Sequence, residues 1–343
     1  MSEPSVMTRD DLVTAARQGD EAAFRDLVEP HRRELHVHCY RMSASLDEAD
    51  DLLQEVMLRA WRGLPRFEGR SSFRTWLYRI ATNVCLSALN KQSRRVLPVA
   101  HRQPAGRPGR ADEPLVESVW IEPYPDEALG VDDGLASPEA RYEQRESVEL
   151  AFIAALQHLS ANQRAALILR DVLGFTAREV ADALGTSTTA VNSALQHART
   201  AVQDRVPDQS QQSTLRSLGD ERLRAIVAAY TTALERGDVD AIVGMLAEDA
   251  TWSMPPYPEW YQGHEAIQEF LVQGPLTVQW RHIATWANGQ LAVGCYARNP
   301  ESGDYRGTVI DVLTLRGEQI GAVTAFVDSE LFQRFGLPAA LLG

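Results

Sequence analysis

The C-terminal third of the chain holds ionisable side chains of the kinds that perform acid–base chemistry. Five are candidates by type and position: Asp249, His264, His282, Asp311 and Asp328. They accompany the stretch "SMPPYPEWYQGHEAI" (253–267), whose prolines, methionine and large aromatic residues are typical of the mouth of a small-molecule pocket. A general base needs a positioned partner and a shifted pKa, and the sequence indicates neither. We therefore assign no catalytic residue and no cofactor, and expect this region to bind a ligand or another part of the chain.

Six residues are assigned to this pocket or to a contact between domains: Trp252, Tyr257, Trp260, Tyr261, His264 and Asp311. The aromatic residues carry this interpretation more than the histidine does. His264 follows Gly263 at a predicted helix start, where an imidazole is an ordinary surface group. Asp311 alternates with Val309 and Leu313, so it points either into the pocket or to a bulge or edge of a strand.

No metal site is predicted. The segment "HVHC" (36–39) places two histidines at positions i and i+2, which point apart on a helix. The three cysteines, Cys39, Cys85 and Cys295, stand far apart in the sequence without C-x-x-C spacing. They are expected to be small buried hydrophobic residues.

Nucleic-acid binding is the second chemistry that the residues indicate. The net charge of −13 argues against a phosphate partner, which requires clustered Lys and Arg. Single segments differ from this average, because 59–95 contains nine basic residues and one acid, Glu68, whereas 46–55 contains five acids and no base. A basic and an acidic patch therefore follow each other in the chain.

Residues 174–202, "GFTAREVADALGTSTTAVNSALQHARTAV", predict a helix-turn-helix. Thr176 and Glu179 form a capping box, Gly185 allows the turn, and Ser187 caps the second helix. The exposed row of that helix suits base edges and phosphates in a major groove, although a solvated helix face is the alternative. The residues assigned to DNA are Arg178, Thr188, Asn192, Gln196 and Arg199.

The block 46–95, "LDEADDLLQEVMLRAWRGLPRFEGRSSFRTWLYRIATNVCLSALNKQSRR", resembles region 2 of the extracytoplasmic-function (ECF) sigma factors of bacterial RNA polymerase. The helix-turn-helix and the residues before it resemble region 4 of the same family. The two segments stand in the family's order with a linker between them. The resemblance implies a chain that binds core RNA polymerase, through the β′ clamp helices and the β flap, and that binds promoter DNA.

The resemblance also implies roles for residues of region 2. The acidic outer face of one helix would dock on the clamp helices, with the residues Asp47, Asp51, Gln54 and Glu55. The loop 66–73 would receive a flipped base of the −10 element. The residues assigned to the −10 DNA are Phe67, Arg70, Ser71, Arg79, Asn83, Arg94 and Arg95. Phe73 and Trp76 fit the apolar stripe of their helix, so core packing competes with base stacking as their role.

The elements that must position these residues form a multidomain chain. Two all-α sigma domains, a region 2 bundle and a region 4 helix-turn-helix, are followed by an α+β domain in which helices precede an antiparallel meander. The predicted ranges are 8–95 for region 2, 96–136 for an acidic linker rich in Pro and Gly, 137–206 for region 4, 207–215 for a second linker and 216–343 for the C-terminal domain. Within the first linker, "WIEPYPDEAL" (120–129) is unusually rich in anchoring residues for a passive tether.

Residues 216–343 resemble the SnoaL-like branch of the NTF2-like superfamily, in which a curved sheet and helices close a cone around a pocket. Sigma factors with such an extension form recognised subgroups, and this chain is similar to the SigG-type group. The resemblance implies that the extension modulates the sigma domains in cis, with a small-molecule ligand as a candidate partner.

The chain contains no apolar run of the ~18 residues that a membrane span requires, and its N-terminus is polar, so we expect a cytoplasmic protein without a membrane partner. Two other functions stay open on sequence alone. One is a helix-turn-helix regulator that acts without polymerase, and the other is a SnoaL-like enzyme fused to a DNA-binding part that regulates it. We expect a sigma factor without enzymatic activity.

Overall fold

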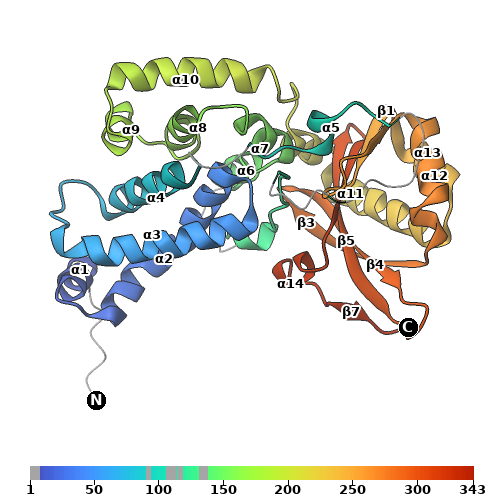
Figure 1. Ribbon diagram of the computed structural model, residues 1–343, viewed down its shortest axis with the longest axis horizontal. Coiled ribbons are helices and arrows are strands. Elements are labelled where there is room, and N and C mark those ends of the chain that lie inside the picture. The colour runs from blue at the N-terminus through green and yellow to red at the C-terminus, as the bar shows by residue number, and fades with distance from the viewer. Residues whose placement is uncertain (1–7, 90–93, 106–113, 115–118, 131–137) are drawn as a thin grey trace. The chain divides into compact units, whose positions relative to one another are not determined.

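The structure is a computed structural model that describes residues 8–89, 94–105, 114, 119–130 and 138–343 (Figure 1). The chain divides into two compact units. The first comprises Met1–Gln92 with His158–Val202, and the second comprises Ser93–Gln157 with Gln203–Gly343. None of the helices in the described ranges is long and apolar enough to cross a membrane.

The first unit is all-helical, as predicted. Its N-terminal part contains α1 (Arg9–Arg17), α2 (Glu21–Ser43), α3 (Leu46–Gly63), the 3₁₀ turn η1 (Leu64–Arg66) and α4 (Phe73–Leu89). Its later part contains α8 (Ala161–Leu167), the π-helical turn η3 (Ile168–Val172), α9 (Ala177–Leu184) and α10 (Thr188–Gln203). Thr8 forms a capping box with Asp11 at the start of α1, which explains why the helical region begins there.

The second unit contains the C-terminal domain and the described part of the first linker. The linker side contributes α5 (Pro98–His101), η2 (Asp126–Leu129), α6 (Pro138–Glu146) and α7 (Leu150–Leu156). The remaining helical elements are α11 (Gln211–Arg236), α12 (Val239–Met245), α13 (His264–Gln273), η4 (Pro275–Thr277) and α14 (Leu331–Arg334). The helix start predicted at Ser137-Pro138 agrees with α6, although Ser137 lies outside the described residues.

A curved sheet and the helices against it form the C-terminal core. The strands are β1 (Leu246–Ser253), β2 (Trp260–Gln262), β3 (Trp280–Ala287), β4 (Gln290–Arg298), β5 (Tyr305–Arg316), β6 (Gln319–Val327) and β7 (Ala340–Leu341), in the order β2-β1-β6-β5-β4-β3 with β7 paired to β5. Helix α11 packs on β3, β4 and β5, and α13 packs on β1 and β2. This arrangement confirms the predicted α+β cone (Figure 1).

The sheet contains the predicted meander, β3 to β6, and extends it by β1, β2 and β7. Strands β3 to β6 are antiparallel neighbours, but β1 pairs with β6 in parallel, with Trp252 opposite Val323. The sequence of β1 obscured this strand, because a register shift between Leu246 and Thr251 interrupts its alternation of buried and exposed residues.

Helix α11 also begins earlier than predicted, inside the polar segment 207–215. Ser210 caps its first turn, and Gln211 and Gln212 are buried despite their polar side chains. The helix changes direction at Gly219, whose φ of 73° is accessible to glycine without strain. Polar residues here therefore form a helix start that is fixed by neighbouring segments.

Candidate functional site

The acidic face predicted for polymerase binding lies on α3. Asp47, Asp51 and Gln54 are exposed, whereas Glu55 is half-buried and forms an ion pair with Arg59 at 2.6 Å. The opposite side of the helix is buried through Leu52, Leu53, Val56 and Ala60. This amphipathic packing fixes the helix and turns its carboxylates outward.

The residues predicted for −10 DNA gather at the start and along one side of α4, except for the pair at 94–95. Arg70, Ser71, Arg79 and Asn83 are exposed. Arg70 is 85% exposed and pairs with Glu68 of the same loop, a contact that solvent screens strongly. The predicted DNA-binding residues of the loop and of α4 are therefore accessible within the first unit.

Phe67 lies half-buried on the aromatic part of this surface. Its ring lies 5.1 Å from the ring of Trp76 and 5.8 Å from that of Phe73. Phe73 and Trp76 are themselves buried, which favours core packing over base stacking for both. Phe67 is thus held by the core beneath it while part of its ring stays accessible, which suits a side chain that stacks on an unpaired base.

Arg95 lies elsewhere than predicted. It belongs to the second unit and is buried, where its Nη1 donates a hydrogen bond to the Trp120 carbonyl at 2.9 Å and lies 3.5 Å from the Glu122 carboxylate. Arg94 beside it is exposed. In this arrangement the guanidinium of Arg95 is bonded to the linker, so the predicted phosphate contact requires these bonds to break.

The helix-turn-helix has the predicted local chemistry. Thr176 and Glu179 form a capping box, Gly185 ends α9 with a φ of 63°, and Ser187 accepts a hydrogen bond from the Ala190 amide. All five residues assigned to −35 DNA are exposed. Arg199 bonds to both Asp171 oxygens, at 2.6 and 2.8 Å. A DNA phosphate would have to compete with this carboxylate for the Arg199 guanidinium.

Helices α4 and α9 pack against each other within the first unit, and we call this the α4–α9 contact. The Arg74 guanidinium lies 5.3 Å from the ring of Phe175, which is itself 5.3 Å from the ring of Tyr78. The Thr75 hydroxyl donates a hydrogen bond to the Glu179 carboxylate at 3.3 Å. The two predicted DNA-binding regions are therefore joined side chain to side chain.

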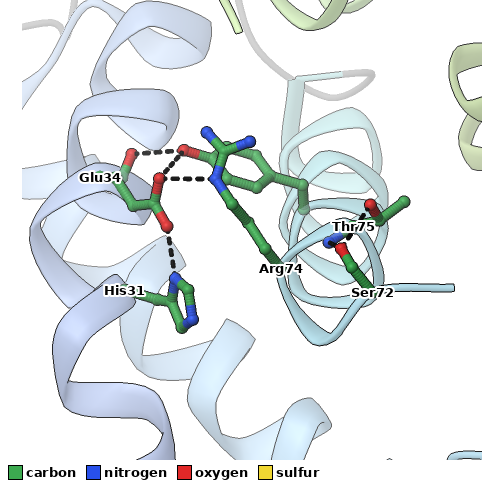
Figure 2. Close-up of polar contacts among 6 residues, drawn as sticks. His31, Glu34, Ser72, Arg74 and Thr75 are labelled. Carbon is green, nitrogen blue, oxygen red and sulfur yellow. Dashed lines mark hydrogen bonds and ion pairs between the residues drawn. The ribbon is translucent and has the colours of Figure 1, made fainter. Parts of the chain in front are cut away.

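A carboxylate of α2 orients Arg74 for this contact. Figure 2 shows Glu34 between His31 and Arg74, with Arg74 Nε 3.0 Å from Glu34 Oε2. The Tyr78 hydroxyl also donates to Glu34 Oε2, at 3.1 Å. Burial raises the pKa of Glu34, but the hydrogen bond from His31 and the charge of Arg74 outweigh it, so the pKa falls below its usual value.

Helix α8 makes a second connection between these regions. Arg164 on α8 is buried and donates a hydrogen bond from Nη1 to the Met42 carbonyl at the end of α2. Burial lowers the pKa of its guanidinium to about 10. Burial of a guanidinium costs free energy unless its N–H donors are hydrogen-bonded. If the bond to Met42 breaks, water must therefore take the place of the Met42 carbonyl as acceptor.

The residues of "HVHC" bond in different directions. His36 Nε2 lies 3.0 Å from Asp50 Oδ1, whereas His38 Nε2 lies 3.1 Å from Thr82 Oγ1. Burial lowers the pKa of His38 to about 3, so its ring is neutral. The described residues contain no group of three or more side chains that could hold a metal ion.

The C-terminal domain contains a partly open cavity of about 480 Å³. Four of the six residues predicted for a pocket or domain contact line it: Trp252, Tyr257, Tyr261 and Asp311. The stretch that suggested a pocket mouth therefore contributes two of its rings, and Asp311 points into the cavity rather than to a strand edge. Burial raises the pKa of Asp311 to about 6, against hydrogen bonds from Tyr230 and Cys295 that lower it.

The other two predicted residues, Trp260 and His264, serve different contacts. Trp260 meets the linker, because its Nε1 donates to the Arg102 carbonyl and its own carbonyl accepts from the Ala105 amide, both at 2.8 Å. His264 is the first residue of α13, and its Nε2 lies 3.1 Å from the carbonyl of Ala247 on β1. The histidine thus fastens a helix start and does not face the cavity.

The turn between β3 and β4, which we call the 288–290 turn, holds two separate parts of the chain before α11. Asn288 accepts from the Tyr124 amide at 2.8 Å and donates to the Val148 carbonyl at 2.7 Å. Gln290 accepts from the Leu150 amide at 3.0 Å. The sequence indicated only a turn at "NGQ", because nothing local reveals that its side chains bond to distant backbone.

Glu149 reinforces this arrangement from the linker side. Its two carboxylate oxygens accept from the amides of Gln211 and Gln212 at 3.0 and 2.8 Å, at the first turn of α11. Anionic side chains are favourable at a helix N-terminus. Burial nevertheless raises the pKa of Glu149 to about 7, although the two amide bonds lower it.

The buried residues of "WIEPYPDEAL" explain why this stretch carries so many anchors. Trp120, Ile121, Tyr124 and Leu129 are all buried in the second unit. The Gly289 amide donates to Asp126 Oδ1 at 2.7 Å. The described linker is therefore part of the C-terminal unit and no passive tether.

Comparisons with known proteins match three parts of the chain to families. Residues 27–95 match the Sigma-70 region 2 family, residues 149–202 match Sigma-70 region 4, and residues 227–323 match the SnoaL-like domain family. The region 4 match includes α7, which packs in the second unit, as well as α8 to α10 of the first.

Individual relatives span most of the chain. The ECF RNA polymerase sigma factor SigG of Mycobacterium tuberculosis is 45% identical over 329 residues, which cover 95% of this chain and 86% of that protein. The RNA polymerase sigma-H factor of Pseudomonas aeruginosa is 30% identical over 191 residues, or 56% of this chain and 90% of that protein. The crystal structure of M. tuberculosis SigJ covers 90% of this chain and 97% of its own with a TM-score of 0.57 at 20% identity, which shows a shared fold. The protein belongs to the extracytoplasmic-function sigma factors, and it is an alternative sigma factor of RNA polymerase with a C-terminal SnoaL-like domain.

Proposed function

We propose that this sigma factor docks on core RNA polymerase through the acidic face of α3 and through region 4, opens −10 DNA with the 66–73 loop and α4, and reads −35 DNA with α10. The exposure of these faces within the first unit supports the proposal. The protein acts in the cytoplasm and makes no covalent bond itself, because polymerase performs the chemistry. The SnoaL-like domain regulates initiation in cis.

The observation that carries the cis regulation is the incorporation of the linker and α7 into the C-terminal unit. The 288–290 turn bonds to backbone groups of the linker and of α7 through the side chains of Asn288 and Gln290. In return, the Glu149 carboxylate accepts hydrogen bonds from backbone amides at the first turn of α11. By family resemblance, the linker threads through polymerase channels during initiation. A linker held by the 288–290 turn is not available for that path, so release from this turn is part of activation.

The α4–α9 contact supports a closed resting state of the sigma domains. By their names, the −35 and −10 elements lie about 25 base pairs apart, or roughly 85 Å of DNA at about 3.4 Å per base pair. Helix α10 has 16 residues and follows α9 after a short turn, so it reaches only about 24 Å further at about 1.5 Å per residue. With Thr75 bonded to Glu179, regions 2 and 4 cannot occupy both elements, and the contact must open.

Transcription by core polymerase on a cognate promoter tests the regulatory contact, with Asn288→Gly in the full-length chain. Asn288 has a positive φ of 56°, which glycine adopts without strain, so the variant removes two buried hydrogen bonds and keeps the turn. At about 1 kcal/mol for each bond, we expect transcript yield at limiting sigma factor to rise severalfold.

Asn299→Gly is the matched control, because the side-chain bonds of Asn299 stay within its own turn, to the amides of Glu301 and Ser302. Equal transcription by Asn288→Gly and wild type would contradict control through the 288–290 turn. A fall in transcription would contradict inhibition by this contact. Failure of every variant and of wild type to initiate, or to co-purify with β′, would overturn the polymerase-dependent surfaces proposed above.

A further inference from the structure

The cavity of the SnoaL-like domain has the dimensions and walls of a small-molecule site. Its volume of about 480 Å³ lies within the usual range for ligand pockets of roughly 300–1,000 Å³. Five aromatic side chains line it: Trp252, Tyr257, Tyr261, Phe270 and Trp280. Most of the remaining wall is aliphatic, so the cavity favours a flat apolar body.

Asp311 places one carboxylate in this apolar wall. Tyr230 and Cys295 both donate to its Oδ2, at 2.8 and 3.4 Å. In the described part of the chain no hydrogen bond reaches Oδ1. Asp311 is 4% exposed and lines the cavity, so its second oxygen is available to a molecule inside and to little else.

The groups around Asp311 do not neutralise its charge. Among the described residues that line the cavity, none is Lys or Arg. Burial raises the pKa of both Tyr230 and Cys295, so they stay protonated and neutral. On β3, burial lowers the pKa of His282, whose Nδ1 lies 3.2 Å from Glu235 of α11. The partner of Asp311 on β6 is apolar Ala325.

A buried carboxylate without a cation is unfavourable, and a ligand that brings the positive charge relieves this cost. Aromatic faces attract the same kind of ligand through cation–π interaction. A carboxylate or phosphate ligand would add repulsion at Asp311. The charge of Asp311 and the aromatic walls thus both favour a positively charged ligand.

We propose that the SnoaL-like cavity binds a hydrophobic organic cation, with a flat apolar body between the aromatic side chains and a protonated amine paired with Asp311. The proposal that such a cation binds rests only on the cavity and the residues that line it. Its effect on transcription rests on the cis regulation proposed above.

Three probes with one apolar body test the class of ligand: naphthylmethylamine, naphthylmethanol and naphthoate, titrated into the full-length protein at pH 7.5 by calorimetry. We expect the amine to bind at least tenfold more tightly than the alcohol, and the carboxylate to bind most weakly. Asp311→Asn keeps the shape and should reduce amine affinity at least tenfold while leaving alcohol affinity within about twofold. Asp249→Asn is the control, because that carboxylate is exposed and pairs with Arg316 outside the cavity.

Acidity provides a second readout on the wild-type protein. Since the pKa of Asp311 is about 6, amine affinity should fall as the pH drops from 7.5 to 5, and this dependence should disappear in Asp311→Asn. Equal binding of amine and alcohol, or a pH dependence that survives in Asp311→Asn and so belongs to His282, would overturn the proposal.

Transcription with and without the amine then separates the two proposals. A change in yield that requires Asp311 supports both. Binding that depends on Asp311 without any change in yield supports the site and contradicts control by the SnoaL-like domain. Absence of binding, with Asn288→Gly still altering transcription, overturns the site alone.

Discussion

Asp311 is a residue whose position opposes folding at neutral pH. Its pKa is 3.8 in an ordinary setting and about 6 in the fold, so the folded chain binds more protons than the unfolded chain between these values. The free energy of unfolding therefore decreases as the pH rises from about 4 to 6, and it stays reduced above that. A ligand that pairs with the carboxylate would offset this cost, which packing alone does not.

Replacement of Asp311 by Asn in the unliganded protein should remove this penalty. A difference of about two pKa units corresponds to at most ~3 kcal/mol, and the Asn oxygen can still accept from Tyr230. We expect Asp311→Asn to stabilise the C-terminal unit at pH 7.5 and to have little effect at pH 4, measured by denaturant unfolding with tryptophan fluorescence. An equal gain at both values would show that charge is not the cause.

At the scale of elements, α3 separates its structural side from its binding side. The buried side carries the apolar residues, and Asp51 on the other side is exposed. Asp51→Arg should therefore leave the fold intact and weaken binding to core polymerase at least tenfold, as measured by competition with a labelled sigma factor.

Asp26→Arg reverses an equally exposed charge on α2 and should bind core polymerase like wild type. If both variants bind equally weakly, net charge rather than the face of α3 determines affinity. If neither is affected, the docking face lies elsewhere.

The elements that could be predicted are those whose signals are local. Helical periodicity and capping residues such as Thr176 and Glu179 define regions 2 and 4 before any tertiary contact is known. The parallel pairing of β1 with β6 and the burial of Arg95 could not be predicted, because both depend on segments far apart in the chain. The aromatic stretch 253–267 predicts a binding surface, yet no local signal divides its residues between the cavity, the linker and a helix start.

At the scale of the whole molecule, the chain passes three times between the two units. Region 2 lies in the first unit, the linker with α7 in the second, α8 to α10 in the first, and the SnoaL-like domain in the second. The part of region 4 formed by α8 to α10 is consequently bounded on both sides by segments that belong to the C-terminal unit. Movement of region 4 away from region 2 must therefore be transmitted to those segments through the backbone.

Cross-linking tests whether the α4–α9 contact has to open. In a Thr75→Cys and Glu179→Cys double variant, a short bismaleimide should bind the two helices and abolish promoter binding by the holoenzyme. Each single variant treated in the same way is a control, and the native cysteines are buried. Full promoter binding by the cross-linked protein would contradict the closed resting state.

The close approach of Arg145 and Gln212 to Gly289 determines where the chain can be cut and joined to another protein. A methyl group there would lie 2.9 Å from the Arg145 carbonyl and 2.8 Å from Gln212 Nε2, so the turn fits only the segments that already surround it. A chimaera joined at residue 206, with another sigma factor upstream, would supply a foreign surface to this turn and leave Glu149 behind. A transplantable sensor has to include residues 93–157 together with 203–343, and its natural seams lie at 92/93, 157/158 and 202/203.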